Sequence, residues 1–426
     1  MCPRIIGALM PSVLLVSIDY WPEETGIGPY STGLAEHLAA AGHDVTVLAG
    51  MPHYPQWQVA PDYRGKWRHR EERNGVHIIR RRHYVPTRQS AVRRAAYEAS
   101  WLFHAGLVAP APRTDAVLGV IPSLSGGIIA RLAAARARAA YGVVVQDLVS
   151  AAAAQSGIEG GRTVADMTRR IESWSLSHAT VVAPVAEAFR PALSEMGIAD
   201  ERIVILPNWS HLPASSGDRR QTRQRLGWTE DDWIVLHAGN MGLKQGLDQV
   251  LDAGRLADRD GAAVRIVLMG DGSQRETLVG RAEGTERLEF RAFVATAELP
   301  DVLAAADVLL LSERPTVMDM SLPSKLTSYF AAGRPIVAAV HPDGASAREL
   351  ARAGAGVTAK AGDPEALLGA IMGLRDLPDR GNALGQAGRR YAQTALGEAA
   401  TFARADAIID RLVERTAVRR RNDKNG

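Results

Sequence analysis

The sequence is 426 residues long, with 46% hydrophobic, 23% charged and only 5% aromatic residues. This length suits two or three α/β domains, and the composition is typical of a soluble globular protein, which excludes the disordered and fibrous classes. The formal net charge of +3 arises from nearly balanced acids and bases, so it gives no support to nucleic-acid binding.

The cysteine count and the N-terminal hydropathy bear on location. A single cysteine, Cys2, leaves no partner for a disulfide and no cluster for a structural zinc, which fits a reducing cytoplasm. Residues 1–18 are apolar but are interrupted by Pro3 and Pro11, and no apolar run reaches the length that spans a membrane. We therefore expect a cytoplasmic protein whose membrane contact would be peripheral, at the inner face.

Short Val/Ile/Leu runs alternate with helical patterns along the chain, which indicates βαβ units and buried, mostly parallel sheets. The expected strands are residues 13–18, 45–49, 76–80, 116–120, 143–146, 180–183 and 203–206 in the first half, and 234–238, 264–269, 288–290, 308–311, 336–339 and 356–359 in the second. Each half thus carries enough strands for its own doubly wound sheet.

The domain boundaries follow from composition. The stretch 211–224 is polar and rich in Pro, Ser, Gly and Arg, which predicts a hinge. We expect one Rossmann-like domain over residues 1–210 and a second over residues 211–384. Residues 385–426 predict C-terminal helices that pack back toward the N-terminal domain and end in a basic, disordered tail.

In open parallel sheets, ligands bind beyond the carboxyl ends of the strands, so the loops there are the candidate sites. The loop after the first strand carries Gly26 and Gly28 before a helix start, whose free N–H groups suit a phosphate. Its spacing differs from the three-glycine dinucleotide fingerprint, which disfavours an NAD enzyme. Two glycines in a plain turn explain this loop equally well.

Three later segments carry the same kind of signal. Glycines follow the strands at 234–238 and 264–269, and Pro323 and Ser324 can open a helix whose first turn, with Lys325, attracts an anion. Gly333 and Pro335 then end that helix. Glycine turns at strand ends in both halves indicate one ligand shared by the two domains.

Taken in order, these segments resemble the family-four retaining glycosyltransferases of GT-B fold, over nearly the whole chain. The matching motifs are the Gly26 turn, Pro207-Asn208, Gly239-Asn-Met-Gly with Lys244-Gln-Gly, Gly270-Asp-Gly, and Pro323-Ser-Lys with Ala331-Ala-Gly-Arg-Pro. Pro52-His-Tyr-Pro, Tyr63-Arg64 and Asn74-Gly-Val are similar to its colanic-acid and exopolysaccharide branch. The resemblance implies an α/β protein with two Rossmann-like doubly wound domains facing a central cleft.

The activity that the resemblance implies is transfer of a sugar from a nucleoside-diphosphate sugar to an acceptor hydroxyl, with retention of the anomeric configuration. The C-terminal domain would bind the donor and the N-terminal domain the acceptor. The implied donor-binding residues are Gly26, Gly28, Asn240, Lys244, Gly270, Asp271, Gly272, Phe293, Ser324, Lys325 and Ser328. The catalytic candidates are Lys244 and Asp147, of which Asp147 would orient the acceptor or sugar, or else cap a helix.

The sequence also departs from the family pattern. Met320 and Ser328 stand where many relatives carry two glutamates, which we interpret as altered ribose or sugar recognition. Asn240 replaces a common arginine, and a lost charge-assisted contact would cost about 1.5–3 kcal/mol, so another basic residue such as Arg314 is expected to help. We expect no metal, because helix N-termini, glycine amides and lysine can stabilise the departing diphosphate.

On the acceptor side, we assign Tyr54, Trp57 and Trp67, which lie among many arginines in the insert 51–82. Aromatic faces suit sugars, and arginines suit a pyrophosphate or an anionic lipid surface, so the hypothesis is a lipid-linked saccharide. Nucleic acid is not an expected partner. The alternatives are a transferase acting on a soluble metabolite, a sugar-nucleotide epimerase, and a silent nucleotide-sugar-binding protein.

Overall fold

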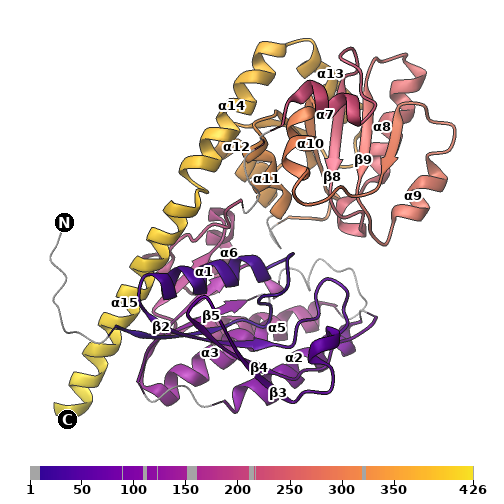
Figure 1. Cartoon of the computed structure of the whole chain (residues 1–426). Helices are drawn as coiled ribbons and strands as arrows, with labels where there is room; N and C mark the ends of the chain where they lie inside the picture. The colour runs from indigo at the N-terminus through magenta and orange to yellow at the C-terminus, as the bar shows by residue number, and fades with distance from the viewer. Residues whose placement is uncertain are drawn as a thin grey trace. The chain divides into compact units, whose positions relative to one another are not determined.

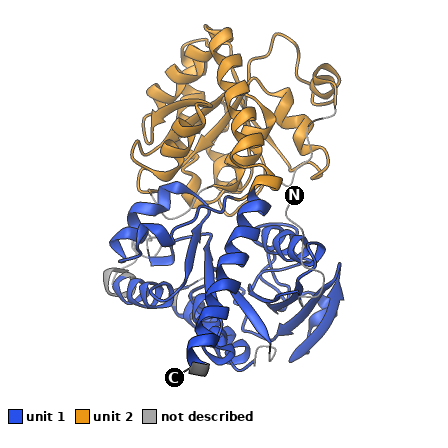
Figure 2. Ribbon diagram, turned by 90° about the vertical axis from the view of Figure 1, so that its left-hand side faces the viewer, with its two compact units in different colours: residues 1–207, 401–426 blue, residues 208–400 orange. Residues whose placement is uncertain are grey.

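The computed structural model describes residues 10–88, 90–108, 113–121, 123–150, 161–210, 215, 217–318 and 323–425. The chain divides into two compact units, shown in blue and orange in Figure 2. Unit 1 comprises Met1–Pro207 with Thr401–Gly426, and unit 2 comprises Asn208–Ala400. The boundaries that the sequence suggested fell after residues 210 and 384.

Unit 1 is built on a seven-stranded sheet in the order β3-β4-β2-β1-β5-β6-β7. Its strands are β1 (Ser12–Val16), β2 (Asp44–Gly50), β3 (Arg68–Arg73), β4 (Val76–Arg81), β5 (Thr114–Ile121), β6 (Ala140–Val145) and β7 (Val181–Pro184). Only β3 is antiparallel to its neighbour; the other pairs are parallel. The inner strands are buried along nearly their whole length, as expected when helices cover both faces.

The helices of unit 1 are labelled in Figure 1. They are α1 (Gly28–Ala40), α2 (Ala91–Gly106), α3 (Leu124–Ala137), α5 (Gly161–Leu176), α6 (Arg190–Glu195) and α15 (Glu398–Asn425). Helices α2, α3 and α5 pack side by side, and α1 packs against β2 and β4. Short 3₁₀ turns lie at Pro61–Tyr63, Glu187–Phe189 and Asp200–Arg202.

Unit 2 is built on a six-stranded parallel sheet in the order β10-β9-β8-β11-β12-β13. Its strands are β8 (Ile234–Ala238), β9 (Arg265–Met269), β10 (Leu288–Arg291), β11 (Val308–Ser312), β12 (Ile336–Val340) and β13 (Gly356–Lys360). Its helices are α7 (Arg219–Arg225), α8 (Asp248–Arg259), α9 (Arg275–Arg281), α10 (Leu299–Ala305), α11 (Ser324–Ala332), α12 (Ala345–Ala353), α13 (Pro364–Arg375) and α14 (Pro378–Thr394), with a 3₁₀ turn at Leu243–Gln245.

Two apolar layers sandwich the sheet of unit 2. Residues of α8, α9 and α13 form one layer, and residues of α10, α11 and α12 form the other. Each unit is therefore a doubly wound α/β fold, which confirms the predicted fold class. All six strands expected in the second half are present.

Two expectations about the chain between and after the sheets need correction. The stretch 211–224 was predicted to be a polar hinge, but α7 begins within it and buries Arg223, whose guanidinium donates to the carbonyls of Ala305 and Thr229. Residues 211–214 and 216 lie outside the described residues. Helix α14 belongs to unit 2, where Tyr391 packs edge-on against Phe330 at 5.5 Å between ring centroids.

The C-terminal tail is also not the disordered segment that was expected. Helix α15 continues to Asn425 and buries Ile408, Ile409 and Leu412 in unit 1. The Oγ1 atom of Thr416 accepts a hydrogen bond of 2.7 Å from the amide of Ala140, and Arg420 pairs with Asp115 at 2.8 Å. These contacts fix the basic end of the helix to the sheet.

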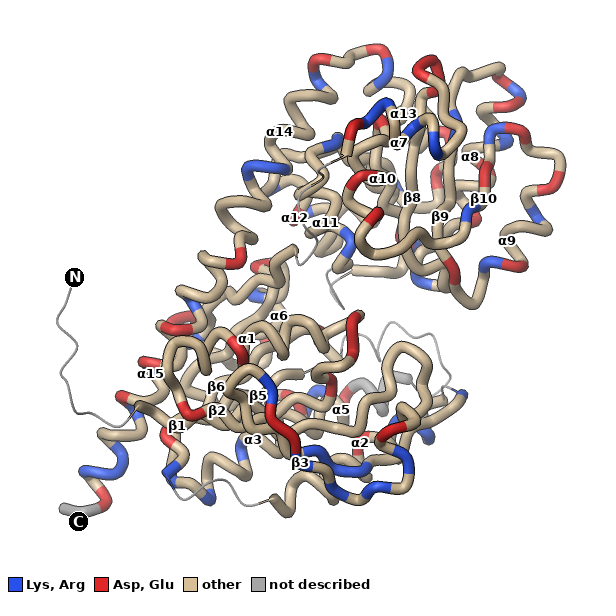
Figure 3. The backbone as a smooth tube through the Cα atoms, in the orientation of Figure 1, with Lys and Arg blue, Asp and Glu red and all other residues tan. Residues whose placement is uncertain are grey.

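Two strand predictions in unit 1 differ from the structure. Strand β3 was not predicted because its sequence, RHREER, has no apolar residue; as an edge strand it carries charges of both signs, visible in Figure 3. Residues 203–206 form only an isolated bridge, between Ile203 and Val182, with two backbone hydrogen bonds beside β7.

Among the described helices, none is long and apolar enough to cross a membrane.

Candidate functional site

The glycine loops of unit 2 meet at the carboxyl ends of β8 and β9. Gly239, Gly270 and Gly272 all have a backbone φ near +150°, a conformation that residues other than glycine rarely adopt. A Cβ atom on Gly270 would lie 2.0 Å from the carbonyl oxygen of Gly239, and one on Gly272 would lie 2.5 Å from Oδ1 of Asn240. The two loops therefore pack backbone against backbone, and only glycine fits there.

Lys325 lies over this glycine surface. Its Nζ atom would be 3.1 Å from a Cβ atom on Gly239 and is 3.2 Å from Nε2 of His237. Burial, opposed by the charge of Glu313, lowers the pKa of Lys325 to about 8. Burial and the charge of Lys325 hold the pKa of His237 well below its usual range, so the imidazole is neutral. A half-buried lysine beside glycine backbone is a geometry that suits a phosphate.

A carboxylate also faces this edge. Glu313 directly follows β11 and is buried, and its Oε1 atom accepts a hydrogen bond of 2.9 Å from the hydroxyl of Ser346. Burial raises the pKa of Glu313 to about 7. The Ser346 hydrogen bond and the positive charges of Lys325 and Lys244 act in the opposite direction but are outweighed. The structure thus places two lysines and one carboxyl group at the same edge.

Other residues predicted to bind the donor lie at the same end of the sheet but are exposed. Asn240 and Lys244 are exposed in the β8 loop, where the carbonyl of Lys244 accepts a hydrogen bond of 2.9 Å from the amide of Arg314. Asp271 and Phe293 are exposed in the loops after β9 and β10. These residues are not joined to Lys325 by described contacts.

Helix α11 begins at Ser324, which is exposed. Its N-cap residue, Pro323, makes no side-chain capping hydrogen bond. Ser328 is half-buried one turn further along. Met320 lies outside the described residues. Arg314 is exposed, with its Cγ atom near the backbone of Gly246.

In unit 1, the glycine loop after β1 folds onto the loop after β2. A Cβ atom on Gly26, whose φ is +70°, would lie 2.9 Å from the Tyr54 ring, and one on Gly28 would lie 2.7 Å from the carbonyl of Glu23. Oε1 of Glu23 accepts hydrogen bonds from the amides of His53 and Tyr54, at 2.8 and 2.9 Å. These contacts fix the position of Tyr54 at the carboxyl edge of the sheet.

Tyr54 lies among carboxylates from two loops, those after β1 and β6. Burial raises the pKa of its hydroxyl, and the charges of Asp19, Glu23 and Asp147 raise it further. Asp147 follows β6 and is half-buried. The structure therefore brings together Tyr54 and Asp147, which the sequence had assigned separately to the acceptor side.

The two predicted tryptophans occupy different environments. Trp57 is half-buried and packs edge-on against His53 and Tyr97, at 5.6 and 5.9 Å between ring centroids. Trp67 is 63% exposed, and the guanidinium of Arg82 lies 4.8 Å from its ring centroid. Both line one groove of about 760 Å³, whose other walls include Tyr63, Arg64, Lys66, Tyr84 and His104.

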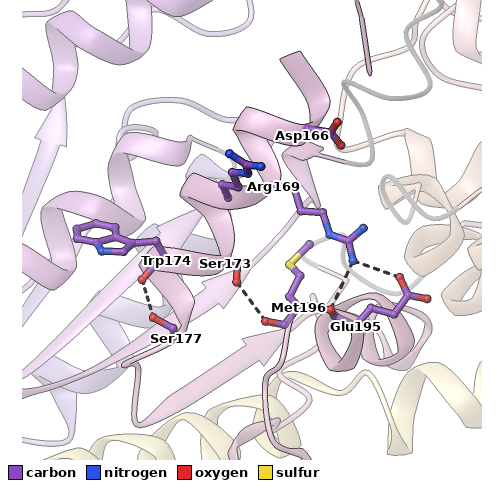
Figure 4. A pocket seen from close by; sticks show the side chains of 8 residues that line it. Asp166, Arg169, Ser173, Trp174, Ser177, Glu195 and Met196 are labelled. Atoms are coloured by element: carbon purple, nitrogen blue, oxygen red, sulfur yellow. Dashed lines mark hydrogen bonds and ion pairs between the residues drawn. The ribbon is translucent and has the colours of Figure 1, made fainter. Parts of the chain in front are cut away.

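A second hollow of about 680 Å³ lies between α5 and α6, as Figure 4 shows. Some of its polar groups are already engaged with one another: Arg169 pairs with Glu195 at 3.5 Å, and the hydroxyl of Ser173 donates to the carbonyl of Met196. It extends to Ser177, which precedes β7, away from the carboxyl edge. Fold and chemistry therefore both favour the strand-end loops as the functional site.

Residues 25–209 match the family described as "Glycosyl transferase 4-like domain", and residues 232–376 match "Glycosyl transferases group 1". The chain is 30% identical over 331 residues to the putative colanic acid biosynthesis glycosyl transferase WcaI of Escherichia coli K12, which covers 75% of this chain and 81% of WcaI. The chain belongs to the family-four glycosyltransferases of GT-B fold, in the colanic-acid and exopolysaccharide branch.

Solved structures share the fold of this glycosyltransferase. Sucrose-phosphate synthase from Thermosynechococcus elongatus superimposes with a TM-score of 0.71 at 16% identity, over 94% of this chain and 99% of that one. HepE of Anabaena in complex with UDP-glucose superimposes with a TM-score of 0.64 at 16% identity, over 94% of this chain and 99% of HepE.

One group of side chains in this glycosyltransferase has the composition of a metal site. Ligand atoms of Asp19, Glu23 and His53 all lie within 4.8 Å of one another. Ligand atoms around a zinc ion lie about 3–3.5 Å apart, given bonds of about 2.0–2.2 Å. Because one oxygen of Glu23 already accepts two amide hydrogen bonds, the group fits a hydrogen-bonded cluster better than a metal site.

The sequence reasoning missed the buried ionisable residues of this glycosyltransferase. Glu313, His237, Asp19 and Glu23 were not selected, although each lies in or directly beside a strand-end loop. Their position in or after apolar runs was a usable signal, because a buried ionisable group there must find a partner or a ligand.

Proposed function

We propose that this glycosyltransferase moves a sugar from a nucleoside-diphosphate sugar to an acceptor hydroxyl with retention of the anomeric configuration, in exopolysaccharide or glycoconjugate biosynthesis. The observation that carries the proposal is Lys325, a half-buried lysine lying over a glycine surface at the carboxyl edge of unit 2. Such a surface offers charge and close backbone approach to a diphosphate. The relationship to WcaI supports the biosynthetic role.

In the proposed reaction, the bond between the sugar's anomeric carbon and the diphosphate oxygen breaks, and its electron pair stays on the diphosphate. The acceptor oxygen bonds to the same face of the anomeric carbon, and its proton passes to the leaving diphosphate. Negative charge develops on the diphosphate, where Lys325, Lys244 and the first turn of α11 would stabilise it. This chemistry requires no metal ion.

Product analysis by ¹H NMR tests retention and the metal requirement together. The full chain is incubated with α-linked UDP-, GDP-, ADP- and dTDP-sugars and a panel of octyl glycosides and prenyl-diphosphate-linked monosaccharides. We expect one donor to give an α-linked product with release of its nucleoside diphosphate, at the same rate with and without EDTA. A β-linked product, or release of nucleotide and free sugar with every acceptor, would contradict the proposal.

We further propose that the acceptor is a lipid-linked saccharide, held where unit 1 contacts a membrane surface. The groove that contains Trp67 is lined by Arg64, Lys66 and Arg82. The ring of Trp67 packs on His104 of α2, next to Phe103 and near the C-cap residue Leu107, which are 65% and 71% exposed. Basic and aromatic side chains together favour an anionic, apolar interface.

Vesicle sedimentation tests this contact. The full chain should bind vesicles containing anionic phospholipid more tightly than purely zwitterionic vesicles, and Trp67→Ala with Phe103→Ala should reduce that binding several-fold. Trp174→Ala is the matched control, because Trp174 is 45% exposed on α5. Unchanged binding in the double variant, together with faster transfer to octyl glycosides than to prenyl-linked sugars, would favour a soluble acceptor.

A further inference from the structure

The loops after β1 and β2 enclose a cluster of ionisable groups that the proposed reaction has not yet used. Asp19, Glu23 and His53 form it, and β1 and β2 are neighbours in the sheet, so their carboxyl ends deliver these residues to one place. The side chains of Glu23 and His53 are 2% and 1% exposed, whereas that of Asp19 is 16% exposed. Asp19 is therefore the member of the cluster that solvent or a ligand can reach.

The buried members hold one another in place. Nδ1 of His53 lies 3.3 Å from Oε1 of Glu23 and 3.1 Å from the carbonyl oxygen of Met51, while Nε2 lies 4.0 Å from Asp19 and 3.3 Å from the hydroxyl of Tyr97. Burial tends to lower the pKa of His53, but the hydrogen bond with Glu23 and the charge of Asp19 raise it overall. The imidazole thus lies between two carboxyl groups that favour its charged form.

The cluster is also incompletely satisfied. Oε2 of Glu23 is buried without a hydrogen-bond partner among the described residues. Burial and the charge of Glu23 raise the pKa of Asp19 to about 7. The charges of His53 and Arg94 act in the opposite direction but are outweighed. The destabilised carboxylate of Asp19, which is partly exposed, is therefore stabilised by a ligand that donates a hydrogen bond to it.

The surrounding charges define what that ligand can be. Glu98 faces Asp19 from α2, and Asp147 faces Tyr54 from the β6 loop; Arg94 is the cation that acts on Asp19 from α2. An edge with this excess of carboxylates repels phosphates and attracts hydroxyl groups, which can donate to it. A neutral sugar end, rather than a phosphate, matches this chemistry.

We propose that Asp19 accepts a hydrogen bond from a hydroxyl group of the acceptor sugar, and that Glu23 and His53 position its carboxylate. This inference rests on the proposed function and names the acceptor's reacting end as a neutral polyol. Asp19 is a binding and orienting residue, and the proton of the reacting hydroxyl still passes to the leaving diphosphate. Glu23 has a second task, since it also fixes the backbone of Tyr54.

Steady-state kinetics of Asp19→Asn test the proposal with the acceptor that the wild-type chain uses best. Loss of a charge-assisted hydrogen bond, worth about 1.5–3 kcal/mol, should raise the KM for the acceptor about 10- to 150-fold while the Kd for the nucleoside diphosphate stays unchanged. Asp44→Asn is the matched control, because Asp44 is exposed at the opposite end of β2. An unchanged acceptor KM in Asp19→Asn would overturn the proposal.

A pH profile provides a second readout that a purely structural role would not move. The wild-type KM for the acceptor should rise as the pH falls below about 7, because Asp19 becomes protonated. Removing the His53 charge should raise the pKa of Asp19, so His53→Gln should move this transition to higher pH. An unmoved transition would contradict the assignment even if Asp19→Asn failed to fold.

Two further outcomes separate this inference from its alternatives. If EDTA abolished transfer and a divalent cation restored it in the wild type but not in Asp19→Asn, the cluster would be a metal site and the proposal would fail. If the wild-type chain bound no nucleoside diphosphate and transferred no sugar, the proposed function itself would fail.

Discussion

At the two sheet edges, burial shifts the pKa values of individual ionisable residues toward their neutral forms. In unit 2, Glu313 is buried and Lys325 is half-buried at the same edge, and desolvation shifts both toward their neutral forms: the pKa of Lys325 is lowered to about 8 and that of Glu313 is raised to about 7. In unit 1, the pKa of Asp19 is raised to about 7. Groups held this way are typical of sites where a ligand supplies the missing partner.

Lys325→Ala should weaken binding of the nucleoside diphosphate about 10- to 150-fold, because a charge-assisted hydrogen bond is worth about 1.5–3 kcal/mol. Lysine binds an anion in its charged form, so wild-type affinity should also fall as the pH rises above about 8. Calorimetric titration at pH 7 and pH 9 measures both effects. Lys360→Ala, which removes an exposed lysine of β13, should bind like the wild type, and equal affinity in Lys325→Ala would contradict the assignment.

Asp19→Asn should stabilise the fold at neutral and alkaline pH. Because the folded-state pKa of Asp19 is raised from 3.8 to about 7, its contribution to stability is fully present below about pH 4 and is lost as the pH rises through about 7. Asparagine avoids this loss, so the Tm difference between variant and wild type should be larger at pH 8 than at pH 5. A Tm difference that is the same at both pH values would argue against a strained carboxylate.

At the scale of the elements, the donor edge depends on how closely the loops after β8 and β9 approach each other. The amide of Met241 donates to the carbonyl of Asp271 at 2.7 Å, and the amide of Gln274 donates to the carbonyl of Met241 at 2.9 Å. These hydrogen bonds join the two loops into one surface, with Gly239 and Gly270 at the point of closest approach.

Gly270→Ala should separate these loops, because its Cβ atom would lie 2.0 Å from a backbone oxygen and its φ is +147°. Strain of this kind costs of order 1–3 kcal/mol, so we expect a lower Tm and weaker nucleotide binding. Gly280→Ala is the matched control: Gly280 lies in α9 with nothing within 4 Å of its would-be Cβ atom. Nucleotide binding that is unaffected by Gly270→Ala would place the ligand elsewhere.

How far the sequence predicts these elements depends on whether the signal is local. Apolar runs predicted every strand of unit 2, because buried parallel strands are apolar along their whole length. They could not predict β3, which is held by pairing with β4 and has no apolar residue, and they overestimated 203–206, where only Ile203 forms a bridge. Glycine turns located the loops, but the pairing of Glu23 with the His53 amide depends on residues 30 positions apart in sequence.

At the scale of the whole molecule, unit 1 is completed by the end of the chain. Residues from Thr401 onward belong to unit 1 although the whole of unit 2 precedes them in sequence. His37 of α1 stacks on Phe402 at 4.2 Å between ring centroids and pairs with Asp406 at 2.9 Å. Unit 1 therefore cannot be complete until the last helix has been made.

Leu412→Ala should destabilise unit 1 by about 2–5 kcal/mol, because Leu412 is fully buried on α15. In differential scanning calorimetry, we expect the transition of unit 1 to move to lower temperature while the transition that responds to nucleotide keeps its position. Val418→Ala on the same helix is the control, since Val418 is 45% exposed. Equal destabilisation by both variants would show that α15 is not anchored as described.

The most direct test of the central claim, that the carboxyl edge of unit 2 binds a nucleoside diphosphate, is a thermal-shift screen of UDP, GDP, ADP and dTDP. A ligand at 100 times its Kd adds about 2.7 kcal/mol, which corresponds to about 5–10 °C for a unit of this size. We predict such a rise with at least one nucleotide for the wild type and a much smaller rise for Lys325→Ala. No rise with any of the four, or an equal rise in both proteins, would contradict the account.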